Sequence, residues 1–358
     1  MLAGLILAAG GCNGGGTDRN NVAEANKAAT APVRAAPFDW GSATAEPEFM
    51  RSQALCRAVM RREPPAADRP DAATAAALRG CDAEALYYGI GIPRDPVRAR
   101  QCAFTQPQND PLTAFSGRPM LMTIYANGVG AARDLDVAIH LACTLPNAAA
   151  FEYDGRVTHL ARLRDSRRRG QNFDYCDDIT SGLSAGVCAG HRAALAQPQR
   201  EAALRRLLAG WTEEERRAFE PLRSAFEAFV QASSSGDLAG GGTATGALRI
   251  RLEQGLRDQF VDMLRRLSRG REPHFTAAQF RTEDLQLNQA YRARIADERQ
   301  YDAQGISPES IQNAQRAWLR YRDAFLAFAA VKYPRVPRDS LAAWLTRNRS
   351  EIIPGFSA

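Results

Sequence analysis

One helical face occurs twice in this chain of 358 residues, and no other feature constrains the fold more. Segment 317–328 reads AWLRYRDAFLAF, and segment 218–229 reads AFEPLRSAFEAF. Aromatic residues stand at positions 318, 321, 325 and 328 of the later segment, and apolar residues occupy the same offsets, 219, 222, 226 and 229, in the earlier one. This spacing predicts an amphipathic helix whose apolar stripe faces a core. An internal duplication is the simplest explanation of the two copies.

The segments around each copy predict further helices. Four of them carry a helical period, at 200–211, 245–260, 284–298 and 339–353. Each copy therefore belongs to a unit of three or four amphipathic helices, the first at 171–268 and the second at 280–358. We interpret the glycine-rich stretch 233–246, SSSGDLAGGGTATG, as a mobile connector between two helices.

A second internal repeat lies nearer the N-terminus. Segment 83–103, AEALYYGIGIPRDPVRARQCA, aligns with segment 122–143, MTIYANGVGAARDLDVAIHLAC, at a constant offset of 39 residues. The shared positions are Gly89 and Gly128, Gly91 and Gly130, Asp95 and Asp134, and Ala99 and Ala138. Glycine accepts left-handed backbone, and aspartate at a helix start can accept hydrogen bonds from free N–H groups. Each copy therefore predicts a helix, a tight glycine turn and a second helix.

This pattern, clearest in YANGVGAARD, resembles the Sel-like repeat, a relative of the tetratricopeptide repeat. The resemblance covers about residues 80–145 and implies stacked helix hairpins. Helices at 48–61 and around 154–166 are expected to cap the pair, which gives a repeat module at 48–166. The two GxG sequences do not follow a strand and lack a GK[ST] motif, so we interpret them as turns rather than as a phosphate site.

The first twelve residues, MLAGLILAAGGC, predict export. A short apolar run followed by small residues is typical of a secretory signal. Cleavage before Cys12 resembles the lipobox of bacterial lipoproteins and implies a lipid anchor on that cysteine, although Ala9 stands where a lipobox has leucine. An ordinary cleaved signal peptide is the alternative. Residues 13–47 are expected to form a flexible tether. The expected location is the cell envelope, at the outer membrane facing the periplasm if the source is Gram-negative.

Six further cysteines predict disulfides, because their number is even and the chain is expected to be exported. They are Cys56, Cys81, Cys102, Cys143, Cys176 and Cys188. Six cysteines allow 15 pairings. We favour the consecutive one, Cys56–Cys81, Cys102–Cys143 and Cys176–Cys188, since each partner then lies in a nearby element. The sequence has no CxxC and its four histidines are scattered, so neither a metal site nor a cofactor is predicted.

The second unit resembles the LprI-type lysozyme-inhibitor domain, a small helical domain of exported bacterial proteins. Three stretches carry the resemblance, namely DLQLNQAY, QRAWLRYRDAF and LTRNRSEIIPGF, and segment 175–188 resembles the cysteine-bearing opening of that family. The resemblance implies five signature residues: Gln315, Trp318, Arg322, Asp323 and Arg349. Phe325 departs from the family, which often has cysteine there. We interpret the signature residues as structural, with a direct partner contact by Arg322 and Asp323 as the alternative.

No catalytic constellation is visible, because the histidines lie in different elements and none of them lies within a GxSxG or HExxH motif. We therefore predict an all-α, non-enzymatic envelope lipoprotein that binds a protein partner. The resemblance implies that this partner is a lysozyme-type muramidase. Against this, residues 271–358 carry 13 basic and 10 acidic side chains, and a mildly basic surface steers basic lysozymes poorly.

A periplasmic scaffold that uses the Sel-like repeats is the alternative function. The net charge is +6, and basic and acidic residues alternate along the chain. We therefore predict no nucleic-acid partner, and membrane contact only through the N-terminal anchor.

Overall fold

The computed structural model describes residues 46–108, 114–145, 149–166, 172–238, 242–298, 301 and 306–353. These residues form helices and no strand, which confirms the all-α prediction. Cys12 and the predicted tether up to residue 45 lie outside them. No helix within the described ranges combines the length and the apolar character that a membrane crossing requires.

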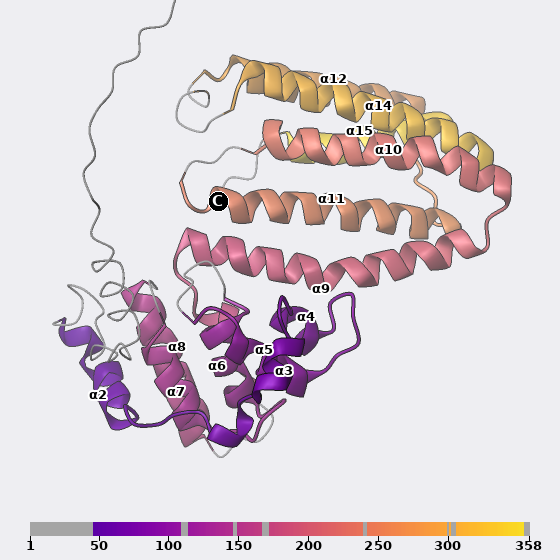
Figure 1. Cartoon of the computed structure of the whole chain (residues 1–358). Helices are drawn as coiled ribbons and strands as arrows, with labels where there is room; N and C mark the ends of the chain where they lie inside the picture. Colours follow the sequence, from indigo (N-terminus) through magenta and orange to yellow (C-terminus); the bar gives the residue numbers. More distant parts are fainter. Residues whose placement is uncertain are drawn as a thin grey trace, which may run out of the picture. The chain divides into compact units, whose positions relative to one another are not determined.

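The N-terminal half consists of short helices. They are α2 (Met50–Ala58), α3 (Ala72–Ala77), α4 (Ala83–Tyr88), α5 (Pro96–Thr105), α6 (Gly117–Asn127), α7 (Leu135–Cys143) and α8 (Ala150–Asp165), with 3₁₀ turns η3 (Pro47–Phe49) and η4 (Ala66–Asp68). Helices α4 and α5 form one hairpin, and α6 and α7 form the next (Figure 1).

The two predicted glycine turns are confirmed. Gly89 and Gly128 end α4 and α6 with φ of 78° and 66°, in the left-handed region that favours glycine. Asp95 and Asp134 begin the second helix of each hairpin, and each side chain accepts a backbone N–H from the first turn at 3.0 Å. The geometry is that of paired helix hairpins, and the Sel-like assignment stays a prediction.

Three disulfides hold the chain, and two differ from the favoured pairing. Cys176 bonds Cys188 as predicted, but the predicted bonds Cys56–Cys81 and Cys102–Cys143 are wrong, because the structure has Cys56–Cys143 and Cys81–Cys102. The reason is packing. Helix α2 packs against α7 and α8 instead of the first hairpin, so Cys56 meets Cys143 at the end of α7. Cys81, just before α4, then faces Cys102 in the partner helix α5.

The described part of the C-terminal half is a bundle of long helices (Figure 1). They are α9 (Gly182–Ala209), α10 (Glu213–Gly236), α11 (Thr245–Ser268), α12 (Ala277–Ala296), α14 (Pro308–Lys332) and α15 (Arg338–Ile352). The duplicated stripes form the middle of α10 and α14, and these two helices share the most extensive helix–helix contact in the described chain. Helix α9 pairs with α11, and α12 pairs with α15.

The central helices run antiparallel. Phe219 near the start of α10 packs on Phe328 near the end of α14, with ring centroids 5.5 Å apart, and Phe226 packs on Tyr321 at 5.4 Å. The order α9, α10, α11 is thereby related to the order α12, α14, α15 by an approximate twofold axis between the two central helices. Both stripes bury their apolar side chains in one continuous core, so the two units complete each other.

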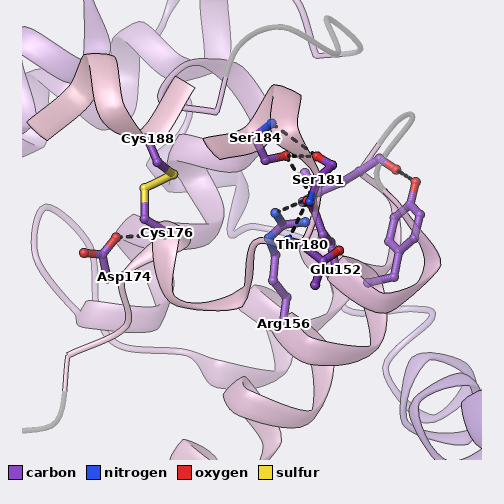
Figure 2. Close-up of polar contacts among 10 residues, drawn as sticks. Glu152, Arg156, Asp174, Cys176, Thr180, Ser181, Ser184 and Cys188 are labelled. Atoms are coloured by element: carbon purple, nitrogen blue, oxygen red, sulfur yellow. Dashed lines mark hydrogen bonds and ion pairs between the residues drawn. A yellow bond between two sulfur atoms is a disulfide. The ribbon is translucent and has the colours of Figure 1, made fainter. Parts of the chain in front are cut away.

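A buried carboxylate joins the two halves (Figure 2). Glu152 of α8 is 1% exposed and accepts hydrogen bonds from the backbone N–H groups of Thr180 and Ser181, at 3.0 and 2.8 Å, where α9 begins. The Ser184 hydroxyl donates to the same carboxylate, and Arg156, fully buried, lies 3.1 Å away. The carboxylate thus caps α9 from a neighbouring helix.

The hydrogen bonds and the ion pair around Glu152 set the ionisation of its carboxyl group. Burial alone would raise the pKa of Glu152, but the hydrogen bonds from Thr180 and Ser181 and the charge of Arg156 lower the pKa below its ordinary value. The Cys176–Cys188 disulfide ties α9 to the 3₁₀ turn η5 (Tyr175–Asp178) beside this joint (Figure 2).

Candidate functional site

Two of the five signature residues meet inside the bundle. Arg349 of α15 is 1% exposed, and its Nε donates to Oε1 of Gln315 on α14 at 3.0 Å. Its two terminal nitrogens donate to the carboxylate of Asp237, at 2.5 and 2.9 Å. A fork of this kind is the geometry that arginine and carboxylate prefer. The guanidinium also lies over the ring of Phe229, 5.4 Å from its centroid.

Sequence reasoning missed the partners of Arg349. Asp237 is 3% exposed, its carboxylate accepts the hydroxyl of Ser233, and its backbone carbonyl accepts a hydrogen bond from Arg294 of α12 at 3.2 Å. Burial lowers the pKa of Arg294, and the nearby charge of Asp237 opposes that effect. We call Ser233, Asp237, Arg294, Gln315 and Arg349 the buried arginine cluster.

The structure corrects the prediction that the whole of 233–246 is a connector between helices. Residues up to Gly236 complete the last turn of α10, and Asp237 caps it. Gly236 is required by a close approach: a Cβ there would lie 2.3 Å from the backbone oxygen of Ser310 on α14. A buried aspartate that follows a glycine at a helix end was the available signal, but polar residues around glycine also favour a loop.

The other three signature residues lie together on α14, where Trp318 packs into the core and Arg322 and Asp323 lie at its edge. Trp318 is 2% exposed, and the guanidinium of Arg322 lies 5.1 Å from the centroid of its rings. Arg322 also contacts the Asp323 carboxylate at 3.3 Å, a partly exposed pair. Arg322 therefore covers Trp318 from solvent, and Asp323 is the signature side chain most available to a partner.

The cluster lies beside several carboxylates. Arg294 and Arg349 are buried with Asp237, and four carboxylates stand outside them at the same helix ends: Asp297 and Glu298 after α12, Glu309 in the first turn of α14, and Glu351 in the last turn of α15. Of these, Glu298, Glu309 and Glu351 are exposed. We call this end of the bundle the acidic end.

Two of the clefts in the described chain lie away from the cluster. One, of about 590 Å³, is formed by α9, α10 and α11, with Leu204, Phe226 and Phe260 as its apolar lining and Arg200 and Arg257 at its rim. Both arginines are paired with carboxylates. Another, of about 600 Å³, lies beside the first glycine turn in the N-terminal half, next to Ile92. No group of His, Cys, Asp and Glu within the described ranges is arranged to hold a metal ion.

The fold and cluster define a helical protein whose C-terminal bundle is fixed by a buried Arg–Asp pair. Residues 274–349 match the family model described as Lysozyme inhibitor LprI. The match covers α12, α14 and most of α15, and with them all five signature residues, so the resemblance seen in the sequence is confirmed for this segment. No curated protein and no solved structure matches the chain.

Proposed function

We propose that this protein binds a lysozyme-type muramidase through the acidic end of its bundle and blocks the enzyme's cleft. The observation that carries the proposal is the match of residues 274–349 to the LprI lysozyme-inhibitor family. In this account the protein has no enzymatic activity of its own. Cys12 carries a lipid that anchors the chain to an envelope membrane, by way of the tether at 13–47.

Charge supports the choice of this end. Animal-type lysozymes are basic, and opposite charge raises the association rate. The composition of residues 271–358 is mildly basic, but Arg349 is buried and paired with the Asp237 carboxylate, and Arg294 is buried and donates to the Asp237 backbone carbonyl. The exposed acidic side chains at their end are Glu298, Glu309 and Glu351. The argument from composition therefore does not apply to this surface.

The buried arginine cluster supplies the rigidity that occlusion needs. It ties together the ends of α10, α12, α14 and α15, from which the acidic side chains project. A surface held in one conformation loses less entropy on binding. Its role in binding is therefore to position, whereas contact falls to the exposed carboxylates.

A cell-wall turbidity assay tests the proposal. The oxidised chain without its lipid should inhibit lysozyme in a dose-dependent manner. The variant Glu298→Gln/Glu309→Gln/Glu351→Gln should inhibit at least tenfold less. The matched control Glu213→Gln/Glu214→Gln/Glu220→Gln removes the same charge from exposed positions on α10 and should inhibit as the wild type does. No inhibition at a large molar excess would refute the proposal.

The N-terminal half supports a second candidate, a periplasmic scaffold. Ile92 and Val97 are 43% and 51% exposed, and Ile92 borders the cleft of about 600 Å³ beside the first glycine turn. Exposed apolar side chains beside a cleft favour protein binding. If Ile92→Asp abolishes a cross-link to an envelope protein and the three Glu→Gln changes do not, the scaffold function is supported.

A further inference from the structure

The opposite end of the bundle gathers unpaired arginines. Helix α11 ends there and α15 begins there (Figure 1). Five arginines lie at this end: Arg269, Arg271, Arg335 and Arg338, which are exposed, and Arg265, which is half-buried. We call them the arginine patch. None of the five forms an ion pair with another residue of the described chain, whereas Lys332 at the end of α14 pairs with Glu215.

Two hydrogen bonds show that these arginines are neighbours although they come from distant segments. The Ser268 and Tyr333 hydroxyls lie 2.9 Å apart, which places Arg269 beside the segment that carries Arg335. The Ser340 hydroxyl donates to the Pro273 carbonyl at 2.5 Å, which places Arg271 beside the start of α15 and Arg338. The acidic residues within these segments are Glu272 and Asp339, and the start of α10 adds Glu213, Glu214 and Glu215 at the same end. Glu213 and Glu215 are paired with Arg217 and Lys332, so positive charge dominates among the unpaired side chains.

Helix stability does not explain the patch. Arg265 lies in the last turn of α11, where a cation is favourable, but Arg338 is the first residue of α15, where the helix dipole opposes a positive charge. Arg335 is held outward by a turn in which the Val336 N–H donates to the Tyr333 carbonyl at 2.9 Å. Pro334 and Pro337 flank this turn, and their fixed φ restricts it further.

The composition of the patch indicates its partner. Cores of protein–protein interfaces are enriched in aromatic residues and methionine. No large apolar side chain of the described segments 265–271 and 333–340 is prominently exposed. Guanidinium groups bind phosphate in a forked geometry, and basic residues near an anionic bilayer each strengthen its attraction. The five arginines cover an end of the bundle and line neither of the clefts described above.

We propose that the arginine patch docks the bundle on the headgroups of an anionic phospholipid bilayer. The contact is electrostatic and needs no lipid on Cys12. It adds to the sequence expectation, in which the membrane is reached only through the N-terminal anchor. It also turns the acidic end of the bundle away from the bilayer.

Vesicle flotation with the unlipidated chain tests this proposal. Vesicles of phosphatidylglycerol and phosphatidylcholine, about 3:7, are compared with pure phosphatidylcholine at low salt. Arg269→Gln/Arg271→Gln/Arg335→Gln/Arg338→Gln should bind the anionic vesicles at least tenfold more weakly than the wild type. The control Arg251→Gln/Arg292→Gln/Arg316→Gln/Arg320→Gln removes the same charge from exposed helix faces and should bind within threefold of the wild type. Circular dichroism melts establish that both variants fold.

Three outcomes would overturn the docking proposal. The wild type would not float with the anionic vesicles at low salt, or both quadruple variants would lose affinity equally, which would show an effect of net charge alone. In the third, the wild type would bind heparin, a linear polyanion, through the patch and would not bind vesicles. Weakening by salt is expected, because exposed charges are screened beyond about 10 Å at 0.1 M ionic strength.

Discussion

Replacing Arg349 by methionine should destabilise the bundle strongly. The side chain is 1% exposed and makes three hydrogen bonds, two of them to a carboxylate that is itself 3% exposed. Methionine fills much of the space but leaves Asp237 buried without its cation. Breaking a buried ion pair in this way costs about 3–5 kcal/mol. In a domain of this size each kcal/mol lowers the midpoint of thermal unfolding by about 2–4 °C, so we expect a fall of roughly 6–20 °C.

Urea and thermal unfolding followed by circular dichroism measure this loss. Arg292→Met on α12 is the matched control, since Arg292 is exposed and forms no ion pair within the described residues, and it should change stability by less than about 0.5 kcal/mol. The double variant Asp237→Asn/Arg349→Met should be more stable than the sum of the single losses implies, by about 1 kcal/mol or more. Strict additivity, or a loss below about 1 kcal/mol for Arg349→Met, would refute the description of the pair as buried and coupled.

Three further predictions concern the joint and the packing. Glu152→Gln should lower the free energy of unfolding by about 3–5 kcal/mol at pH 7, because Arg156 is left buried without its anion. Since the pKa of Glu152 is lowered in the folded chain, the stability that its carboxylate contributes is complete above the ordinary carboxyl pKa of about 4.3 and is lost as the pH falls below it. Urea unfolding at pH 3 should therefore show a smaller difference in stability between the variant and the wild type. Peptide mapping without reduction should recover Cys56 with Cys143, and a recovered Cys56–Cys81 peptide would contradict the packing of α2. Removing the Cys56–Cys143 bond should cost about 4.5 kcal/mol of stability, against about 3.3 kcal/mol for Cys81–Cys102, because it closes the longer loop. Gly236→Ala should lower the free energy of unfolding by about 1–3 kcal/mol, because the new Cβ would meet Ser310. The control Gly255→Ala on α11 has open space around it and should be neutral or stabilising. Equal effects of the two changes would argue against the close contact of α10 and α14.

Local rules predicted the elements well. The aromatic stripe of Trp318, Tyr321, Phe325 and Phe328 has one interpretation as a helix face, and all four side chains are buried. Asp95 and Asp134 cap helices because the capping bond spans only three residues. In each case the interaction that decides the structure is complete within one short segment, so one sequence contains all the information.

Long-range contacts were harder to predict. Cys56 and Cys143 are 87 residues apart, and only the packing of α2 on α7 and α8 brings them together. Arg349 was identified through the resemblance to the LprI family, but its partner Asp237 lies 112 residues earlier, in a stretch whose composition resembles a loop. Alternation of charge along the chain likewise concealed the arginine patch, because its members come from segments that become neighbours only after folding.

The twofold arrangement of the bundle makes the difference between its ends informative. Two identical units packed in this way would present the same side chains at both ends. Instead Glu298, Glu309 and Glu351 project at one end, and Arg269, Arg335 and Arg338 project at the other. Arg223 and Arg322 occupy the same position in the two repeated segments. They do not create this difference, because Arg223 pairs with Glu220 and Arg322 with Asp323. The two units have therefore diverged at their ends while the shared aromatic core kept one packing.

This polarity predicts that the two proposed contacts are independent. The variant Arg269→Gln/Arg271→Gln/Arg335→Gln/Arg338→Gln should lose vesicle binding and inhibit lysozyme as the wild type does. The variant Glu298→Gln/Glu309→Gln/Glu351→Gln should lose inhibition and float with anionic vesicles at least as well as the wild type, since its net charge is more positive. If either variant loses both activities while remaining folded, the two contacts share a surface, and the assignment of one partner to each end is wrong.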